Sequence, residues 1–163
     1  MAKQHSAGPG TPATVALVAQ GIPFTAHTYT HDPATTNYGL EAASALDLDP
    51  DRVFKTLLAE VDGRLAVGIV PVTGMLDLKS LAAACGGKRA VMADPALAER
   101  KTGYVVGGIS PIGQKTALPT VLDETADLWP TIFVSGGRRG FDIELAPADL
   151  LLVTGGTLAD IAR

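Results

Sequence analysis

Cysteine is nearly absent from this chain, which has a single one, Cys85, among its 163 residues. One cysteine cannot form an internal disulfide, so the composition favours the reducing cytoplasm over a secreted, disulfide-rich scaffold. Apolar residues recur around Cys85 at helical spacing, which places its thiol in the hydrophobic core. We therefore interpret Cys85 as a packing residue and not as a nucleophile.

Long apolar runs are also missing, although 47% of the residues are hydrophobic. No run approaches the roughly 20 apolar residues that cross a bilayer, so we expect no membrane among the partners. Residues 1–10 are polar, contain glycine and proline, and lack the apolar stretch of a signal peptide. We expect a disordered leader over 1–10 and one domain over 11–163, a length that can bury a real core.

Positive charge is scarce: the chain has 13 Lys and Arg against 17 Asp and Glu, which gives a net charge of −4. This balance argues against a general nucleic-acid coat, and we expect no DNA partner. All basic residues except Lys3 and Arg163 nevertheless fall between Arg52 and Arg139, while acids dominate both flanks. The sequence is therefore compatible with a local basic patch on an acidic protein.

Turn and cap residues divide the chain into short helices and strands. Thr11-Pro12 opens a helix that Gly21 ends, and Asp62-Gly63 between two apolar runs predicts a β-hairpin. The same signals predict further helices at 38–46, 77–85, 95–103 and 148–154. They predict strands at 24–29, 54–60, 65–71, 89–92, 104–108, 118–123, 131–135, 141–145 and 158–161. Because strands and helices mix irregularly around two hairpins, we expect an α+β single domain with a mixed, largely antiparallel sheet.

Lys55 lies in a strand pattern among apolar neighbours, Val53-Phe54-Lys55-Thr56-Leu57. Side chains alternate between the faces of a strand, so Val53, Lys55 and Leu57 should point the same way. Either this face is solvated and Lys55 extends along the strand edge into water, or its ammonium faces a mostly apolar cavity. In the second case the ammonium loses hydration and needs partners, which is typical of a lysine kept for binding or chemistry.

A glycine-rich loop with the sequence GGISPIG occupies residues 107–113, after the predicted strand 104–108. Glycine places no side chain between backbone and ligand, so N–H groups here can approach a carbonyl or carboxylate, as in an oxyanion hole. An ordinary wide turn has the same composition. The stretch also imitates the phosphate loop GxxxxGKS/T, but Gln114 interrupts it and Pro119 blocks the helix that should follow. We therefore expect no ATP or GTP binding.

Two acids share one face of the predicted strand 141–145, because Asp142 and Glu144 alternate there with apolar residues. If this face meets Lys55, Asp142 would bind the ammonium of an aminoacyl ligand, and Lys55 a carbonyl or phosphate oxygen. Arg138 and Arg139 in the preceding turn would then attract phosphate. The commoner alternative is a solvated outer face with a polar turn.

No catalytic nucleophile or metal set stands out. Neither Ser110 nor Ser135 lies in a G-x-S-x-G elbow, and nothing ties either serine to a histidine. His27 and His31 would share one face of a continuous strand, but no third metal ligand accompanies them. We interpret both histidines as solvated residues at a strand end, and we expect neither a metal nor a cofactor.

Four segments together resemble the YbaK family: Tyr29 with His31-Asp32-Pro33, the segment 53–57, the loop 107–113, and residues 135–145. The resemblance runs in order from about residue 11 to residue 163. YbaK proteins are small free-standing trans-editing proteins, related to the editing domain inserted in bacterial prolyl-tRNA synthetases. The resemblance implies a mixed-sheet α/β fold surrounded by helices, and hydrolysis of a mischarged tRNA, chiefly Cys-tRNA(Pro).

The resemblance also implies roles for particular residues. The family's invariant lysine falls on Lys55, where it would position the terminal adenosine or its phosphate. The catalytic positions would be Lys55, Gly107, Gly108 and Ser110. The substrate-binding positions would be Tyr29, Pro111, Gly113, Ser135 and Asp142, to which we add Arg138 from the basic turn.

The mechanism that the resemblance implies is attack by the substrate's own thiol on its ester carbonyl, which expels the tRNA and leaves a cyclic thioester. Such a reaction needs positioning and oxyanion stabilisation, which a glycine loop and one lysine can supply. Two alternatives stay open: a deacylase for Ala- or Ser-tRNA(Pro), or a non-catalytic module that binds aminoacyl-tRNA or prolyl-tRNA synthetase. We expect a cytoplasmic location, mischarged tRNA(Pro) as the substrate, and prolyl-tRNA synthetase as a candidate partner.

Overall fold

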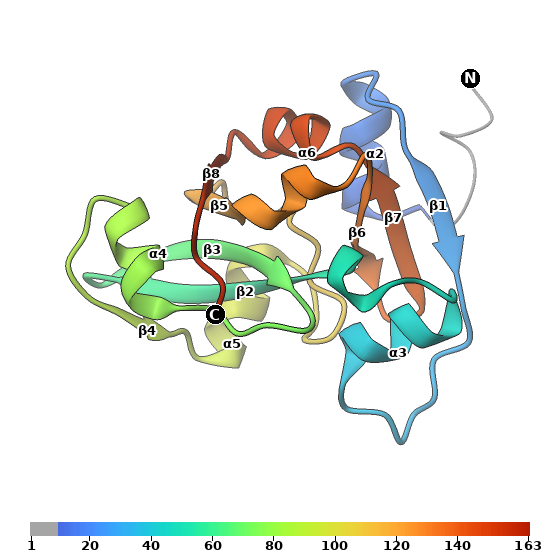
Figure 1. The fold of residues 1–163 in the computed structure, drawn as a ribbon, viewed down its shortest axis with the longest axis horizontal. Helices are drawn as coiled ribbons and strands as arrows, with labels where there is room; N and C mark the ends of the chain where they lie inside the picture. The colour runs from blue at the N-terminus through green and yellow to red at the C-terminus, as the bar shows by residue number, and fades with distance from the viewer. Residues whose placement is uncertain (1–9) are drawn as a thin grey trace.

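The computed structural model describes residues 10–163, whose strands form two sheets (Figure 1). The smaller sheet is antiparallel, in the order β1 (Thr25–Thr28), β7 (Phe141–Leu145) and β6 (Ile132–Arg138). The larger sheet has the order β4 (Ala90–Met92), β2 (Phe54–Val61), β3 (Arg64–Pro71), β5 (Thr120–Asp123) and β8 (Thr157–Ala159). Its first three strands are antiparallel, whereas β5 runs parallel to β3 and β8 runs parallel to β5.

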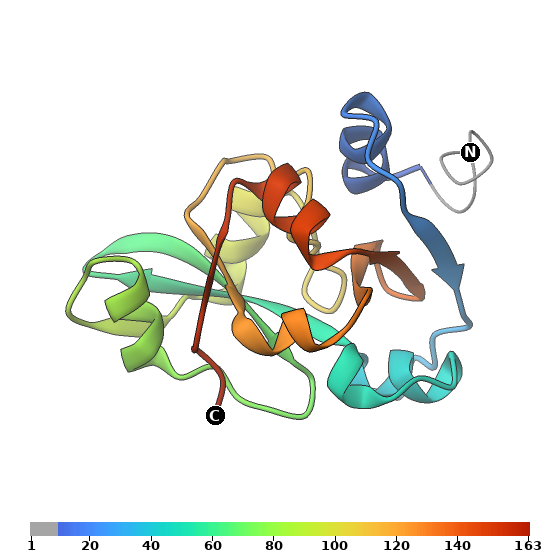
Figure 2. The same ribbon diagram turned by 45° about the horizontal axis from the view of Figure 1, so that its top comes forward.

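Short helices lie around both sheets. They are α2 (Pro12–Ala19), α3 (Tyr38–Ala45), α4 (Leu78–Ala84), α5 (Pro95–Thr102) and α6 (Pro147–Thr154), with 3₁₀ turns η1 (Pro50–Arg52) and η2 (Glu124–Leu128). Figures 1 and 2 show α4 beside the β2–β3 hairpin and α2 beside the smaller sheet. Within residues 10–163, no helix has the length and apolar character needed to cross a membrane.

The two sheets meet where β2 begins. Val53 forms an isolated parallel bridge with Phe133 of β6, and both side chains are buried. Arg52 holds this junction from outside, because its guanidinium donates to the Thr131 carbonyl at 2.7 Å and to the Glu144 carboxylate at 3.3 Å. The largest hydrophobic core contains residues of both sheets and of α2, α5 and α6. The described chain is therefore one mixed α/β domain, which confirms the predicted fold class.

Caps and turns form where the sequence predicts them. Thr11 caps α2 with a side-chain oxygen that accepts the N–H of Thr14, and Asp77 caps α4. Asp62 and Gly63 have φ values of 49° and 83°, the positive pair that a two-residue hairpin turn requires. These predictions are confirmed because each depends on backbone conformation within a few residues.

The predicted strand at 104–108 is wrong, because this segment is an irregular loop. The Val106 N–H donates to the Glu99 carboxylate and the Gly108 N–H to the Val105 carbonyl, so neither pairs with a strand. Gly107 has a φ of +88°, outside the β region. The expected single sheet is two, since β1, β6 and β7 pair with one another. Of the predicted leader, residues 1–9 lie outside the described residues.

Candidate active site between the two sheets

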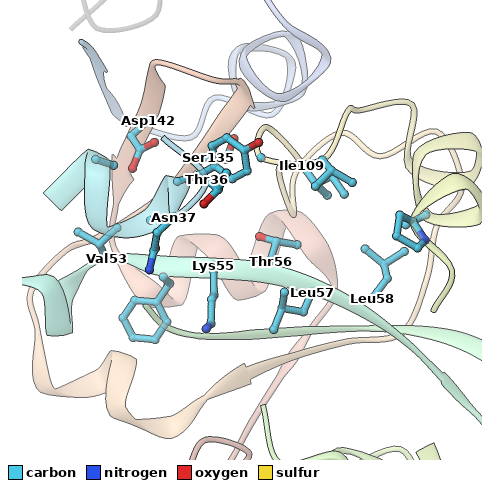
Figure 3. Close-up of a pocket in the computed structure, with 18 of the residues that line it drawn as sticks. Thr36, Asn37, Val53, Lys55, Thr56, Leu57, Leu58, Ile109, Ser135 and Asp142 are labelled. Atoms are coloured by element: carbon cyan, nitrogen blue, oxygen red, sulfur yellow. The ribbon is translucent and has the colours of Figure 1, made fainter. Parts of the chain in front are cut away.

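A cavity of about 560 Å³ opens between the two sheets. Residues of β2 form one wall, and Ser135 of β6 and Asp142 of β7 lie on the facing wall (Figure 3). The other lining residues come from α3 and the loop before it, from the end of β4, and from α5 and the loop after it. The sheets are joined at Val53 and Phe133, and the cavity lies beyond that bridge. Its volume is within the range of about 300–1,000 Å³ that ligand sites occupy.

Asp142 places a buried carboxylate on the cavity wall. It lies on β7, the central strand of the smaller sheet, and the residue is only 6% exposed. Burial raises the pKa of its carboxyl to about 7. No residue between 10 and 163 donates a hydrogen bond to this side chain. A cation that enters the cavity would therefore meet an acceptor that the fold leaves uncompensated.

Lys55 lies half-buried on β2 and lines the same cavity. Burial lowers the pKa of its ammonium. In Figure 3 its side chain leaves β2 on the same side as Leu57 and opposite to Thr56, as alternation along a strand predicts. Across the described residues it forms no ion pair, with Asp142 or any other acid. The Lys55 side chain therefore points away from the wall that carries Asp142, and the two groups do not pair although both residues line the cavity.

Thr56 is a cavity residue that the sequence analysis did not single out. Its Oγ1 is closed off from solvent and has no hydrogen-bond partner within residues 10–163. In Figure 3 the side chain points from β2 toward the wall that carries Ser135 and Asp142. Leaving a buried hydroxyl unpaired costs about 1–3 kcal/mol, and a ligand or water can become its partner only if the neighbouring side chains move aside. No local signal marks Thr56, because threonine is ordinary in a strand.

The first half of the glycine loop supplies backbone groups to the cavity, which Gly107 and Ile109 line. The N–H groups of these two residues have no acceptor within the described part of the chain. The intervening Gly108 differs, because its N–H donates to the Val105 carbonyl at 2.9 Å and its Cα packs against the backbone of Arg138. Both N–H groups are therefore free to donate to a ligand or to water.

The second half of the loop lies elsewhere. Ser110 is fully buried, and its Oγ accepts the N–H of Ile112 at 3.2 Å. Pro111 and Gly113 line a separate cavity of about 190 Å³ between α2 and α6. A Cβ at Gly113 would lie 2.4 Å from the Pro12 carbonyl oxygen. These residues support α2 and do not line the larger cavity.

Tyr29 and Ser135 line the larger cavity, as the resemblance implies, whereas Arg138 lies exposed at the end of β6. Burial, with a smaller contribution from the Asp142 charge, raises the pKa of the Tyr29 phenol, so it stays protonated at neutral pH. Ser135 Oγ accepts the N–H of Gly137 at 3.2 Å. The predicted site residues that the structure brings together are Tyr29, Lys55, Gly107, Ser135 and Asp142.

His27 and His31 are paired with acids and do not line this cavity. His27 Nε2 lies 2.9 Å from Glu144, and His31 Nδ1 lies 2.7 Å from Glu41. The interpretation of solvated histidines is wrong, because both are half-buried. Cys85 packs, also half-buried, against the core beneath α4. In the described part of the chain, no three His, Cys, Asp or Glu residues form a group suited to a metal.

Comparison with known proteins identifies the family. Residues 32–152 match the family model of the aminoacyl-tRNA editing domain. The chain belongs to this family. It is 43% identical over 121 residues to EbsC of Enterococcus faecalis, provisionally named a Cys-tRNA(Pro)/Cys-tRNA(Cys) deacylase, with 73% of each chain covered. This editing domain is also 34% identical over 73 residues to proline–tRNA ligase of Moorella thermoacetica, a match that covers 45% of the chain and 13% of the ligase.

Solved structures share the fold of this editing domain. One described provisionally as a trans-editing enzyme for prolyl-tRNA synthetase is 27% identical, with a TM-score of 0.80 over 96% of this chain and 99% of that one. The structure of hypothetical protein APE2540 has a TM-score of 0.84 at 23% identity, which shows the fold alone. The predicted resemblance to the YbaK family is confirmed.

Proposed function

We propose that this protein is a trans-editing deacylase that hydrolyses mischarged Cys-tRNA(Pro). The observation that carries the proposal is the buried Asp142 carboxyl on the wall of a cavity whose opposite wall, strand β2, contributes Lys55. The 3′ end of an aminoacyl-tRNA carries an α-ammonium, which a carboxylate can bind, and the phosphates of the terminal nucleotides, which a lysine can bind. The name of the relative EbsC supports cysteine as the amino acid.

In this arrangement Asp142 binds the α-ammonium, and Lys55 acts as a fixed positive charge for the terminal adenosine or its phosphate. The N–H groups of Gly107 and Ile109 donate to the ester carbonyl oxygen, where negative charge develops during the reaction. Tyr29 closes the site around the amino acid.

The remaining predicted residues act at the edge of this arrangement. Arg138, exposed at the end of β6, attracts phosphate without entering the cavity. Gly108 and Ser110 hold the loop in shape through the contacts described above, and Pro111 and Gly113 hold it against α2. Ser135 lies beside Asp142 on the neighbouring strand and contacts the same amino acid.

The substrate cysteine supplies the nucleophile in this proposal. Its sulfur bonds to the carbonyl carbon of its own ester, the ester carbon–oxygen bond breaks, and the thiol proton passes to the ribose oxygen of the leaving tRNA. Water then opens the cyclic thioester to give free cysteine. The protein supplies positioning and oxyanion stabilisation, which fits a cavity that neither histidine nor cysteine lines among residues 10–163.

A deacylation assay on Cys-, Ala- and Ser-tRNA(Pro) tests the proposal. We expect Cys-tRNA(Pro) to be hydrolysed fastest, and Lys55→Ala to lose most activity while its circular dichroism stays that of the wild type. Lys79→Ala, at an exposed lysine of α4, is the matched control and should retain activity. Strong hydrolysis of the thiol-free substrates would replace the thiol route by attack of water. Binding without turnover would make the protein an aminoacyl-tRNA binding module.

The charge of the protein bears on how it obtains tRNA. With a net charge of −4 it should bind tRNA weakly by itself, so we propose that prolyl-tRNA synthetase delivers the substrate in the cytoplasm. Adding the synthetase to the deacylation assay should lower KM for the mischarged tRNA. An unchanged KM would argue against this partnership.

A further inference from the structure

Arg139 links three segments that are distant in the sequence. Its Nε and Nη2 donate to the Val106 carbonyl at 3.0 and 2.6 Å. Its guanidinium lies 4.8 Å from the ring centroid of Tyr38. Val106, in the loop after α5, and Tyr38, the first residue of α3, both line the larger cavity. Arg139 itself lies in the turn between β6 and β7, so one side chain connects this turn to two parts of the cavity lining.

Gly107 lies at the centre of this contact. A Cβ on Gly107 would be 2.8 Å from Arg139 Nε and 2.8 Å from Tyr38 Cε2, so glycine alone lets both groups approach this backbone. Gly107 also carries one of the two cavity amides without an acceptor in the described chain. The position of this amide therefore depends on the groups packed on either side of it.

Two hydrogen bonds of backbone N–H groups and the packing of Gly108 against the Arg138 backbone also hold this segment. The Val106 N–H donates to the carboxylate of Glu99. The Gly108 N–H donates to the Val105 carbonyl and closes a local turn. Arg139 forms no ion pair within residues 10–163, so its guanidinium is committed to the Val106 carbonyl and the Tyr38 ring. A planar guanidinium can donate from two nitrogens while it stacks on a ring, which an ammonium cannot do.

We propose that Arg139 is a positioning residue that fixes the Gly107 amide for the editing reaction, through its planar geometry and not through its charge. This role rests on the proposed function, because it concerns the same carbonyl-binding amide. It distinguishes Arg139 from its neighbour Arg138, whose exposed side chain is free to attract phosphate.

The test compares Arg139→Lys with Arg64→Lys, a matched change at an exposed arginine at the start of β3. We measure kcat and KM on Cys-tRNA(Pro), and amide hydrogen exchange over residues 104–109 of the full chain without tRNA. For Arg139→Lys we expect kcat to fall about 10-fold or more with a smaller change in KM, since a misplaced donor weakens oxyanion stabilisation. Exchange should become faster in 104–109 alone, and Arg64→Lys should match the wild type in both measurements.

Arg139→Ala, assayed at several salt concentrations, separates geometry from charge. Arg139 binds phosphate, and the proposal is overturned, if two results are found together. Arg139→Lys would keep the deacylation activity that Arg139→Ala loses, and the activity of Arg139→Ala would depend less on salt than that of the wild type. Wild-type exchange in Arg139→Lys would overturn it as well. A wild type without deacylase activity would instead refute the proposed function, while the exchange data would still decide whether Arg139 orders the loop.

Discussion

Asp142 carries a carboxyl whose pKa is about 7 in the folded protein, against 3.8 for an unperturbed aspartate, because burial disfavours its charged form. Between these two pH values the folded state binds more protons than the unfolded state. Stability therefore falls as the pH rises from about 4 to about 7, and the full cost is present above pH 7. A group that destabilises its own fold in a cavity is typical of a residue kept for binding.

Asp142→Asn removes this charge with little change in shape. At pH 8 we expect the free energy of unfolding to rise by about 1–3 kcal/mol, and at pH 4 to change little, because the native aspartate is already protonated there. Deacylation should fall about 100-fold or more, since a neutral amide does not pair with the α-ammonium. Urea unfolding at both pH values and deacylation kinetics measure these effects. Equal stability changes at the two pH values would contradict an uncompensated buried charge.

Thr56→Val replaces a buried hydroxyl by a methyl group of similar size. Because Oγ1 has no partner within the described residues, we expect stability to stay the same or rise by up to about 1 kcal/mol. If the hydroxyl binds substrate, KM should rise about 3- to 10-fold, the loss of one hydrogen bond. Thr56→Ser keeps the hydroxyl and is the control. Thermal unfolding and deacylation kinetics measure the two effects. A clear loss of stability would show that Oγ1 forms a hydrogen bond within the protein.

At the scale of elements, the loop 107–113 divides into two parts with different surroundings. Gly107 and Ile109 line the larger cavity, whereas Pro111 and Gly113 pack toward α2. The sequence pattern and the family resemblance treat the loop as one unit. The loop is divided because α2 packs against its second half. No residue within the loop predicts this packing.

Gly113→Ala tests the structural part of this division. Gly113 has a φ of +69°, and its added Cβ would meet the Pro12 backbone, which cannot move aside as a side chain could. We expect a loss of at least about 2 kcal/mol in the free energy of unfolding. Gly86→Ala is the matched control, because φ is +73° with nothing within 4 Å, so only the strain of about 1 kcal/mol applies. Urea unfolding of both variants measures the difference, and equal losses would mean that the contact with α2 adds nothing.

At the scale of the whole molecule, an acidic protein presents two basic side chains, Lys55 and Arg138, to the proposed phosphates. Two phosphate contacts predict that log K for tRNA falls against log salt with a slope of about −2, or roughly 10-fold between 50 and 200 mM. Lys55→Ala should bring the slope close to about −1. Fluorescence anisotropy with labelled tRNA measures this slope. A wild-type slope near zero would show that the protein does not bind the tRNA phosphates.

The sequence by itself determined the local elements and the family. The Thr11 cap and the Asp62-Gly63 hairpin depend on neighbouring residues, so short-range rules predict them. Alternation along β2 predicted that Lys55 and Leu57 share one face, as Figure 3 shows. Four motifs in order identified the family, which the comparison confirms.

The tertiary structure alone decided that there is a cavity and what lines it. The sheets touch at Val53 and Phe133, which are 80 positions apart in the chain. The cavity beyond this bridge is lined by Thr56, whose buried Oγ1 has no partner within the described residues. Arg139 likewise meets Tyr38 through space, across about a hundred residues. Such contacts form when distant segments pack together, and no pattern within either segment encodes them.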